Sequence, residues 1–145
     1  MQEESFIAIS DEMLPLVERF GRELGKVTVA PDWLGLFRMT ASGVLRTTTA
    51  RYDGALVGFA LNIVGPHLLY HTTTFGITNA MWLDRAYRGG WQGYKFLRAN
   101  RDNLKTWGAT IAYIARDLTK GDDRLEAVYR RLGYQPDELM YMAAL

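Results

Sequence analysis

The sequence of 145 residues contains no cysteine and only two histidines. The absence of cysteine excludes disulfide bonds, catalysis by a thiolate and zinc sites built on cysteine, and we expect no metal site. Apolar runs are broken within about ten positions, which is too short for a helix that spans a membrane. The opening MQEESFIAIS also lacks the basic start and apolar run of a signal peptide. We therefore expect a cytoplasmic protein with no membrane partner.

An excess of charge of either sign is missing as well. The chain carries 17 Lys and Arg against 16 Asp and Glu, which gives a formal net charge of +1. Nucleic-acid binding needs a strongly basic surface, so nucleic acid is not expected as a partner. With 48% hydrophobic residues, the chain has the size and composition of one compact domain. We predict a single domain over residues 1–145 and leave open whether it is a monomer or a homodimer.

The spacing of apolar residues predicts a mixed α/β fold. The expected elements, in order, are a strand at 5–10, helices at 10–24 and 31–43, strands at 44–52, 55–64 and 79–84, a helix at 93–107, a strand at 109–115, a helix at 122–133, and a strand after 134. Asp53 and Gly54 form the turn dipeptide of a hairpin. Part of the threonine-rich segment 66–80 is expected to form a loop or a ragged strand before the strand at 79–84. These elements fit a central mixed sheet of about six to seven strands with helices on both faces.

Glycines and basic residues gather in YRGGWQGYKFL, where a predicted strand is followed by a helix. The first N–H groups of a helix carry the positive end of its dipole, and glycine lets a ligand approach the backbone. Arg88 would add a bidentate partner for a phosphate. The segment matches neither the P-loop pattern nor the dinucleotide pattern G-x-G-x-x-G. It is therefore interpreted either as an anion-binding junction or as a tight strand-to-helix turn without a ligand.

The same segment resembles the pyrophosphate-binding turn of the GCN5-related N-acetyltransferases. In that family a strand ends in Arg or Gln, two variable residues, Gly, one variable residue and Gly or Ala, and a helix begins. Further along the chain, DDRLEAVYRRLGY resembles the second hallmark of the family, a helix that ends in Tyr-x-x-Leu-Gly-Phe/Tyr. The predicted order of elements also agrees with the family, and small acetyltransferase-like proteins of bacteriophages look similar.

The resemblance implies acetyl-CoA as the cofactor and transfer of its acetyl group to a primary amine of a small molecule or a protein. The backbone of Met81, Trp82 and Leu83 would bind the pantetheine. The implied pyrophosphate contacts are Arg88, Gly89, Gly90, Trp91, Gln92, Gly93 and Tyr94, with Asp122 as a further cofactor contact. Tyr129 would protonate the leaving thiolate, since its hydroxyl titrates in the same range as a thiol.

Two positions depart from the family pattern. Trp91 stands where the family usually has its central glycine, and Asp122 stands where an asparagine often contacts the cofactor. They leave open a second hypothesis, a catalytically silent domain of the same fold that acts as a binding or structural component, for example in a virion. The general base is also open, with His71 as the first candidate and His67 as the second, and a surface role is the alternative for both.

Aromatic and apolar residues of the second predicted helix have two interpretations. Trp33, Phe37 and Met39 would line an acceptor pocket if the resemblance holds, because this region covers the same end of the sheet in the family. An apolar stripe at helical spacing is also typical of a packed core, and we favour the core.

Overall fold

The computed structural model describes residues 1–25, 28–118, 123–138 and 141–143. The chain divides into a large unit, Met1–Ala115, and a small C-terminal unit, Arg116–Leu145. The elements are β1 (Gln2–Glu3), α1 (Ser10–Leu24), α2 (Trp33–Ala41), β2 (Leu45–Tyr52), β3 (Ala55–His67), β4 (Tyr70–Leu83), α3 (Arg85–Arg88), α4 (Gly90–Thr106), β5 (Ile111–Ile114) and, in the small unit, α5 (Asp123–Arg131). No helix in the described ranges is long and apolar enough to cross a membrane.

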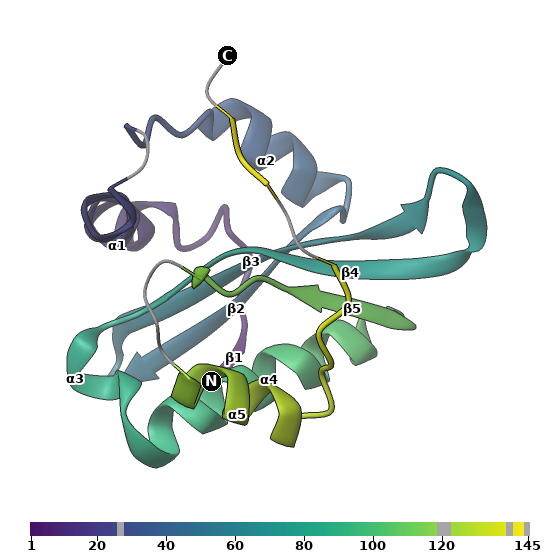
Figure 1. Cartoon of the computed structure of the whole chain (residues 1–145). Coiled ribbons are helices and arrows are strands. Elements are labelled where there is room, and N and C mark those ends of the chain that lie inside the picture. The colour runs from purple at the N-terminus through teal and green to yellow at the C-terminus, as the bar shows by residue number, and fades with distance from the viewer. Residues whose placement is uncertain (26–27, 119–122, 139–140, 144–145) are drawn as a thin grey trace. The chain divides into compact units, whose positions relative to one another are not determined.

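The large unit is built on one mixed sheet with the strand order β1-β2-β3-β4-β5. The first three pairings are antiparallel and the last, between β4 and β5, is parallel. The turn between β2 and β3 is made by Asp53 and Gly54, whose φ angles of 48° and 81° suit a two-residue hairpin. The predicted hairpin is therefore confirmed, and β3 and β4 form a second, longer hairpin that projects from the sheet (Figure 1).

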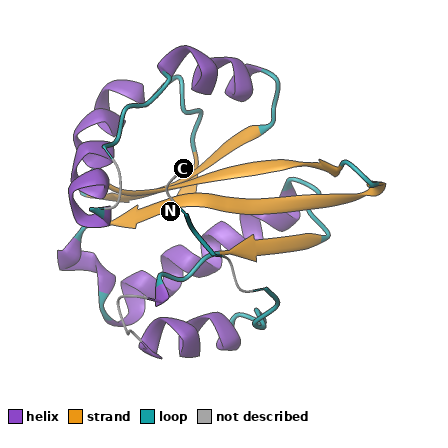
Figure 2. Cartoon of the chain, turned by 45° about the horizontal axis from the view of Figure 1, so that its top comes forward, coloured by secondary structure: helices purple, strands orange, loops and turns teal. Residues whose placement is uncertain are grey.

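Helices cover both faces of this sheet, as Figures 1 and 2 show. On one face, α1 and α2 pack on a core in which Met13 and Phe59 are fully buried. On the other face, α4 places Phe96 against Ala60 and Leu83. The prediction of a mixed sheet between two helical layers is confirmed.

A buried polar cluster joins the sheet to α4. Asn62 on β3, Thr78 on β4 and Asn100 on α4 are 0%, 5% and 1% exposed. The Asn62 Nδ2 group donates to Asn100 Oδ1 over 2.9 Å, and the Thr78 hydroxyl donates to Asn62 Oδ1 over 2.9 Å. The Asn100 Nδ2 group in turn donates to Thr78 Oγ1 over 3.0 Å. Each buried polar side chain thus has partners in the cluster, as burial requires.

The predicted strand at 5–10 is wrong. The chain makes turns over residues 6–9 before α1 begins at Ser10, and the strand is confined to Gln2 and Glu3. Phe6 and Ile9 are nevertheless both in the core, at 1% and 4% exposed. Their spacing of three fits a turn of helical type, whereas neighbours on one face of a strand lie two apart.

Within the threonine-rich segment 66–80, only Leu68 and Leu69 form a turn, and the rest is regular strand of β3 and β4, so the segment is more regular than expected. The sheet has five strands among the described residues, fewer than the predicted six to seven. A strand after residue 134 is not found at 134–138 or 141–143, and the rest of that prediction lies outside the described residues. The short helix α3 was not expected.

The small unit contains the second predicted helix signature. Helix α5 ends near Gly133, whose φ of 88° requires the left-handed region that glycine favours. The Tyr134 N–H group donates to the Tyr129 carbonyl over 3.0 Å and closes the turn. Glu126 accepts from Arg130 over 2.8 Å and pairs with Arg116 over 3.0 Å.

Candidate functional site

Strand β4 separates from β5 partway along its length. The two strands pair only from Phe75 opposite Ile111 to Thr78 opposite Ile114, whereas β4 stays paired with β3 as far as Leu83. Thr78 is opposite Asn62 and Ala80 is opposite Leu61, so Asn79 is the extra residue of a β-bulge. Beyond this bulge, residues 79–83 have no strand partner on the β5 side within the large unit. This segment is called the open edge below.

The direction of the backbone groups along the open edge follows from one hydrogen bond. The Asp84 N–H group donates to the Val57 carbonyl on β3 over 2.8 Å. In an antiparallel ladder alternate residues point their N–H and C=O groups to the same side. The backbone N–H and C=O groups of Trp82 therefore point toward β3. Those of Met81 and Leu83 point away from β3, to the side that β5 leaves open. A ligand with amide groups can pair with such an edge as an added strand would.

The buried cluster of Asn62, Thr78 and Asn100 lies at the start of the open edge. Thr78 is the last residue of β4 that pairs with β5, and the bulge at Asn79 follows it directly. Thr78 donates to Asn62 on β3 and accepts from Asn100 on α4, so both bonds hold β4 at the point where it leaves β5. The sequence analysis missed this cluster, because two asparagines and a threonine far apart in the chain carry no spacing signal.

The first turn of α4 follows the open edge after the short helix α3. Gly89 is the N-terminal cap residue of α4 and makes no side-chain cap, so the first-turn amides of Gly90, Trp91 and Gln92 have no acceptor within the helix. Gly90 has a φ of 62°, which favours glycine. A Cβ added at Gly89 or Gly90 would meet no atom within 4 Å. The first turn thus combines amides that have no acceptor in the helix with open space beside Gly89 and Gly90, and an anion site at a helix N-terminus requires both.

Gly93 and Tyr94 do not belong to this set of amides. Both lie beyond the first turn of α4, where N–H groups bond to carbonyls one turn back. A Cβ at Gly93 would lie 2.2 Å from the Arg88 carbonyl oxygen. The glycine is therefore required by the close approach of the chain's own backbone.

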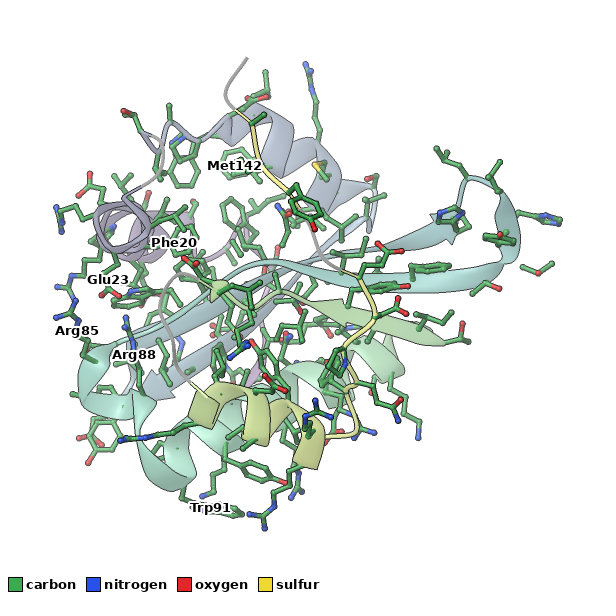
Figure 3. All side chains as sticks on the ribbon, viewed as in Figure 1. Phe20, Glu23, Arg85, Arg88, Trp91 and Met142 are labelled. Carbon is green, nitrogen blue, oxygen red and sulfur yellow. The ribbon has the colours of Figure 1, made fainter. Side chains whose placement is uncertain are left out.

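Arg88 has protein partners in place of the predicted phosphate. Its guanidinium pairs with Glu23 of α1 over 2.7 Å, donates through Nε to the Leu83 carbonyl, and lies over the Trp82 ring at 5.6 Å (Figure 3). Glu23 also accepts from Trp82 Nε1 over 3.2 Å and pairs with Arg85 over 3.5 Å. Burial opposes ionisation of Glu23, but the hydrogen bonds from Arg88 and Trp82 hold its pKa below the usual range.

In this structure the Arg88 side chain ties the turn between β4 and α4 to α1. The phosphate contact expected for Arg88 stays a prediction. Glu23 was missed by the sequence analysis because it lies 65 positions from Arg88 and has the pattern of a solvent-facing residue on a helix.

Trp91 leaves the space over the helix N-terminus clear. Its indole stacks on Tyr94 with ring centroids 5.2 Å apart, and the Lys95 ammonium lies 5.5 Å from the indole centroid. The side chain points away from the sheet, as Figure 3 shows. The departure from the family pattern at this position therefore adds bulk along α4 and leaves the N–H group of Trp91 in place.

His71 lies at the wrong end of β4 for the role of a base. It is exposed, near the tip of the β3–β4 hairpin, eight positions before Asn79. At ~3.3 Å per residue in a strand, this places it about 26 Å from the open edge. His67 is at the same tip, stacked near Tyr70 and Phe75. We therefore leave both histidines out of the site.

Tyr129 lies on α5 in the small unit, where it is 7% exposed and 5.8 Å from the Tyr134 ring. Burial raises the pKa of its phenol above the ordinary range, so the hydroxyl stays protonated at neutral pH. Its role remains a prediction from the sequence motif. Asp122 lies outside the described residues, and the cofactor contact predicted for it is untested.

The fold is similar to that of solved acetyltransferase structures. No protein-family model matches the chain, and no curated protein sequence matches it. Among solved structures, the ribosomal-protein-alanine N-acetyltransferase of Brucella melitensis biovar Abortus 2308 superposes with a TM-score of 0.74 at 16% identity over 99% of this chain and 95% of that chain. An aminoglycoside acetyltransferase from a soil metagenomic sample, solved in complex with sisomicin, gives 0.74 at 14% identity over 99% and 94%.

Aminoglycoside N-acetyltransferase AAC(6')-Iy, solved in complex with CoA, gives a TM-score of 0.64 at 12% identity over 93% of this chain and 94% of that chain. The chain therefore has the fold of the GCN5-related N-acetyltransferases, which confirms the fold that the two sequence motifs predict. At these identities the comparison establishes the fold alone.

Proposed function

We propose that this protein is an acetyl-CoA-dependent N-acetyltransferase that acts on a primary amine. The observation that carries the proposal is the open edge at residues 79–83 followed, across one short helix, by the uncapped N-terminus of α4. Coenzyme A has an extended arm with amide groups that leads to a diphosphate. The arm would pair with the open edge, and the diphosphate would lie at the first turn of α4. The known relatives with the same fold include acetyltransferases of two different acceptors, so the fold leaves the acceptor open.

The fit of coenzyme A rests on backbone groups. Met81 would pair with the pantetheine amides through its N–H and C=O groups, which point away from β3, and Leu83 would contribute only its N–H group, because its carbonyl accepts from Arg88. The amides of Gly90, Trp91 and Gln92 would bind the pyrophosphate, in the space that the glycines leave empty. Bound acetyl-CoA supplies an acyl group activated as a thioester.

The chain's own groups then serve the transfer. A backbone N–H group of the open edge would stabilise the negative charge that develops on the carbonyl oxygen as the neutral amine attacks. As the sequence motif implies, the Tyr129 hydroxyl would supply the proton that the sulfur leaving group needs when the amide bond forms and the carbon–sulfur bond breaks. The proton lost by the amine passes to water.

A silent domain of the same fold is the second candidate. The observation that favours it is the pairing of Arg88 with Glu23, which removes from the turn the cation that a diphosphate would use. A protein of this kind would keep the architecture and bind no coenzyme A.

Replacement of Gly89 by Asp tests whether acetyl-CoA binds at the first turn of α4, as the transferase requires and the silent domain does not. Gly89 has φ −77° and ψ 156°, the extended geometry of an N-terminal cap, and a side chain there meets open space. Aspartate is a preferred cap, so Gly89→Asp should fold with equal or slightly higher stability. Its carboxylate would occupy the anion position and repel a diphosphate.

The measurement is the unfolding temperature with and without acetyl-CoA. Acetyl-CoA at ~100 times its dissociation constant should add roughly 2.7 kcal/mol of stability to the wild type. Gly89→Asp should show no shift, and Gly89→Ala, the matched control without a charge, should keep it. No shift of the wild type at millimolar acetyl-CoA would leave only the silent domain.

A further inference from the structure

An apolar cavity of about 180 Å³ lies between α1, α2 and the sheet. Its lining includes four aromatic side chains, Phe6, Phe20, Trp33 and Phe59, and several aliphatic ones, among them Leu36, Leu61 and Ala80. The rings of Phe20, Trp33 and the side chain of Leu36 are only partly buried, so the cavity is reached from outside. The core of this face therefore leaves a hollow that the protein's own side chains do not fill.

The cavity adjoins the open edge through one residue. Ala80 lines the cavity and is also the first residue of β4 after the bulge at Asn79. Its neighbour Met81 directs its backbone groups to the open edge. Ala80, whose methyl group takes little space, is thus the residue that the cavity shares with the open edge.

The cavity carries no charge among its described lining residues. Glu23, on the same helix as Phe20, is paired with Arg85 and Arg88 and is hydrogen-bonded to Trp82. Placing several ammonium groups in such surroundings would cost solvation without a carboxylate to offset it. The chemistry of the lining therefore disfavours a polycationic acceptor.

The volume of the cavity limits the size of the group that enters it. Whole ligands occupy pockets of roughly 300–1,000 Å³, whereas an apolar cavity of about 150 Å³ is enough to hold benzene. A cavity of about 180 Å³ thus accommodates one aromatic ring or one branched aliphatic group. The rest of the acceptor must lie outside it.

Resting on the function proposed above, we infer that the acceptor is a primary amine that carries a single aromatic or branched aliphatic group on a short spacer. The apolar group occupies the cavity, and the amine lies at the open edge beside Ala80. Polycationic amines are excluded by the uncharged lining.

The test uses the chain of residues 1–145 with three amines: 2-phenylethylamine, ethylamine and the polycationic aminoglycoside sisomicin. Release of free CoA gives kcat/KM for each, and 2-phenylethylamine should exceed both others at least tenfold. Equal or better turnover of ethylamine or sisomicin overturns the inference while leaving the transferase activity established.

Binding of 2-phenylethylamine provides a readout that does not depend on catalysis. Ligand-observed NMR saturation transfer should detect it on the wild type, and Leu36→Glu, which places a carboxylate in the lining, should abolish the signal. Leu34→Glu is the matched control on the same helix, because Leu34 is 58% exposed and lies outside the lining.

The two proposals fail in different ways. Loss of the acetyl-CoA shift in the wild type refutes the transferase, and the NMR experiment still decides whether the cavity takes an apolar amine. Absence of a 2-phenylethylamine signal, or an equal signal with Leu36→Glu, overturns the inference whatever the cofactor does.

Discussion

Replacement of Asn62 by Leu tests whether the buried polar cluster holds the sheet and α4 together. Asn62 is fully buried and accepts from Thr78 while donating to Asn100, each over 2.9 Å. Leucine has a similar volume and no polar atom. The change therefore removes hydrogen bonds without opening a large cavity.

The expected loss of stability follows from the groups left behind. The Thr78 hydroxyl loses its acceptor and Asn100 Oδ1 loses its donor, and both remain buried. A buried polar group without a partner costs about 1–3 kcal/mol, so two of them cost roughly 2–6 kcal/mol. Domains of this size are stable by about 5–15 kcal/mol, so the variant should lose a large share of its stability.

Urea denaturation followed by circular dichroism measures the change. The double variant Asn62→Leu with Asn100→Leu leaves only Thr78 without partners, so it should cost about 1–3 kcal/mol and less than the sum of the single changes. Additive costs, or a loss below about 1 kcal/mol for Asn62→Leu alone, would refute the view that the three side chains act as a unit.

Three further predictions concern the turn, the acid and the response to pH. Gly93→Ala should destabilise the protein by roughly 1–3 kcal/mol, because its Cβ would lie 2.2 Å from a backbone oxygen; Gly90→Ala, at φ 62°, should cost about 1–2 kcal/mol. Thermal unfolding of both, compared with the wild type, checks these values, and equal stability would contradict the geometry. Tyr129→Phe should lower kcat by a factor of about 10² or more with little change in acetyl-CoA affinity, if Tyr129 is the acid; an unchanged kcat in steady-state assays would remove it from the mechanism. Burial raises the pKa of Glu4, but hydrogen bonds, chiefly from Arg51, lower it more, so the net pKa is depressed and its stabilising effect is lost as the pH falls. The stability difference between wild type and Glu4→Gln should shrink between pH ~6 and ~3; a difference that grows toward low pH would reverse the sign of this argument.

The helices and the hairpin were predictable because their signals are local. Ser10 starts a helix, Asp53 and Gly54 make a turn, and the glycine-rich junction precedes a helix at the expected place. Each of these depends on neighbours within a few positions, where propensity and periodicity act.

The parts of the site that escaped prediction depend on contacts between distant residues. The pairing of Glu23 with Arg88 joins α1 to a turn 65 positions away. No sequence pattern within either segment predicts this ion pair. The length of β4 was missed for a related reason, because a strand rich in threonine owes its regularity to its pairing with β3. The bulge at Asn79 likewise exists only relative to its partner strand.

The close approach of Gly93 to the Arg88 carbonyl affects what the glycine motif can reveal about a chain. Position 93 requires glycine because the Arg88 carbonyl lies where a side chain would be. This requirement holds whether or not a ligand binds nearby. A motif that includes this glycine therefore identifies the shape of the turn and does not indicate whether a ligand binds there. At Gly89 a side chain would meet no atom within 4 Å, so an inactive descendant would be free to change this residue.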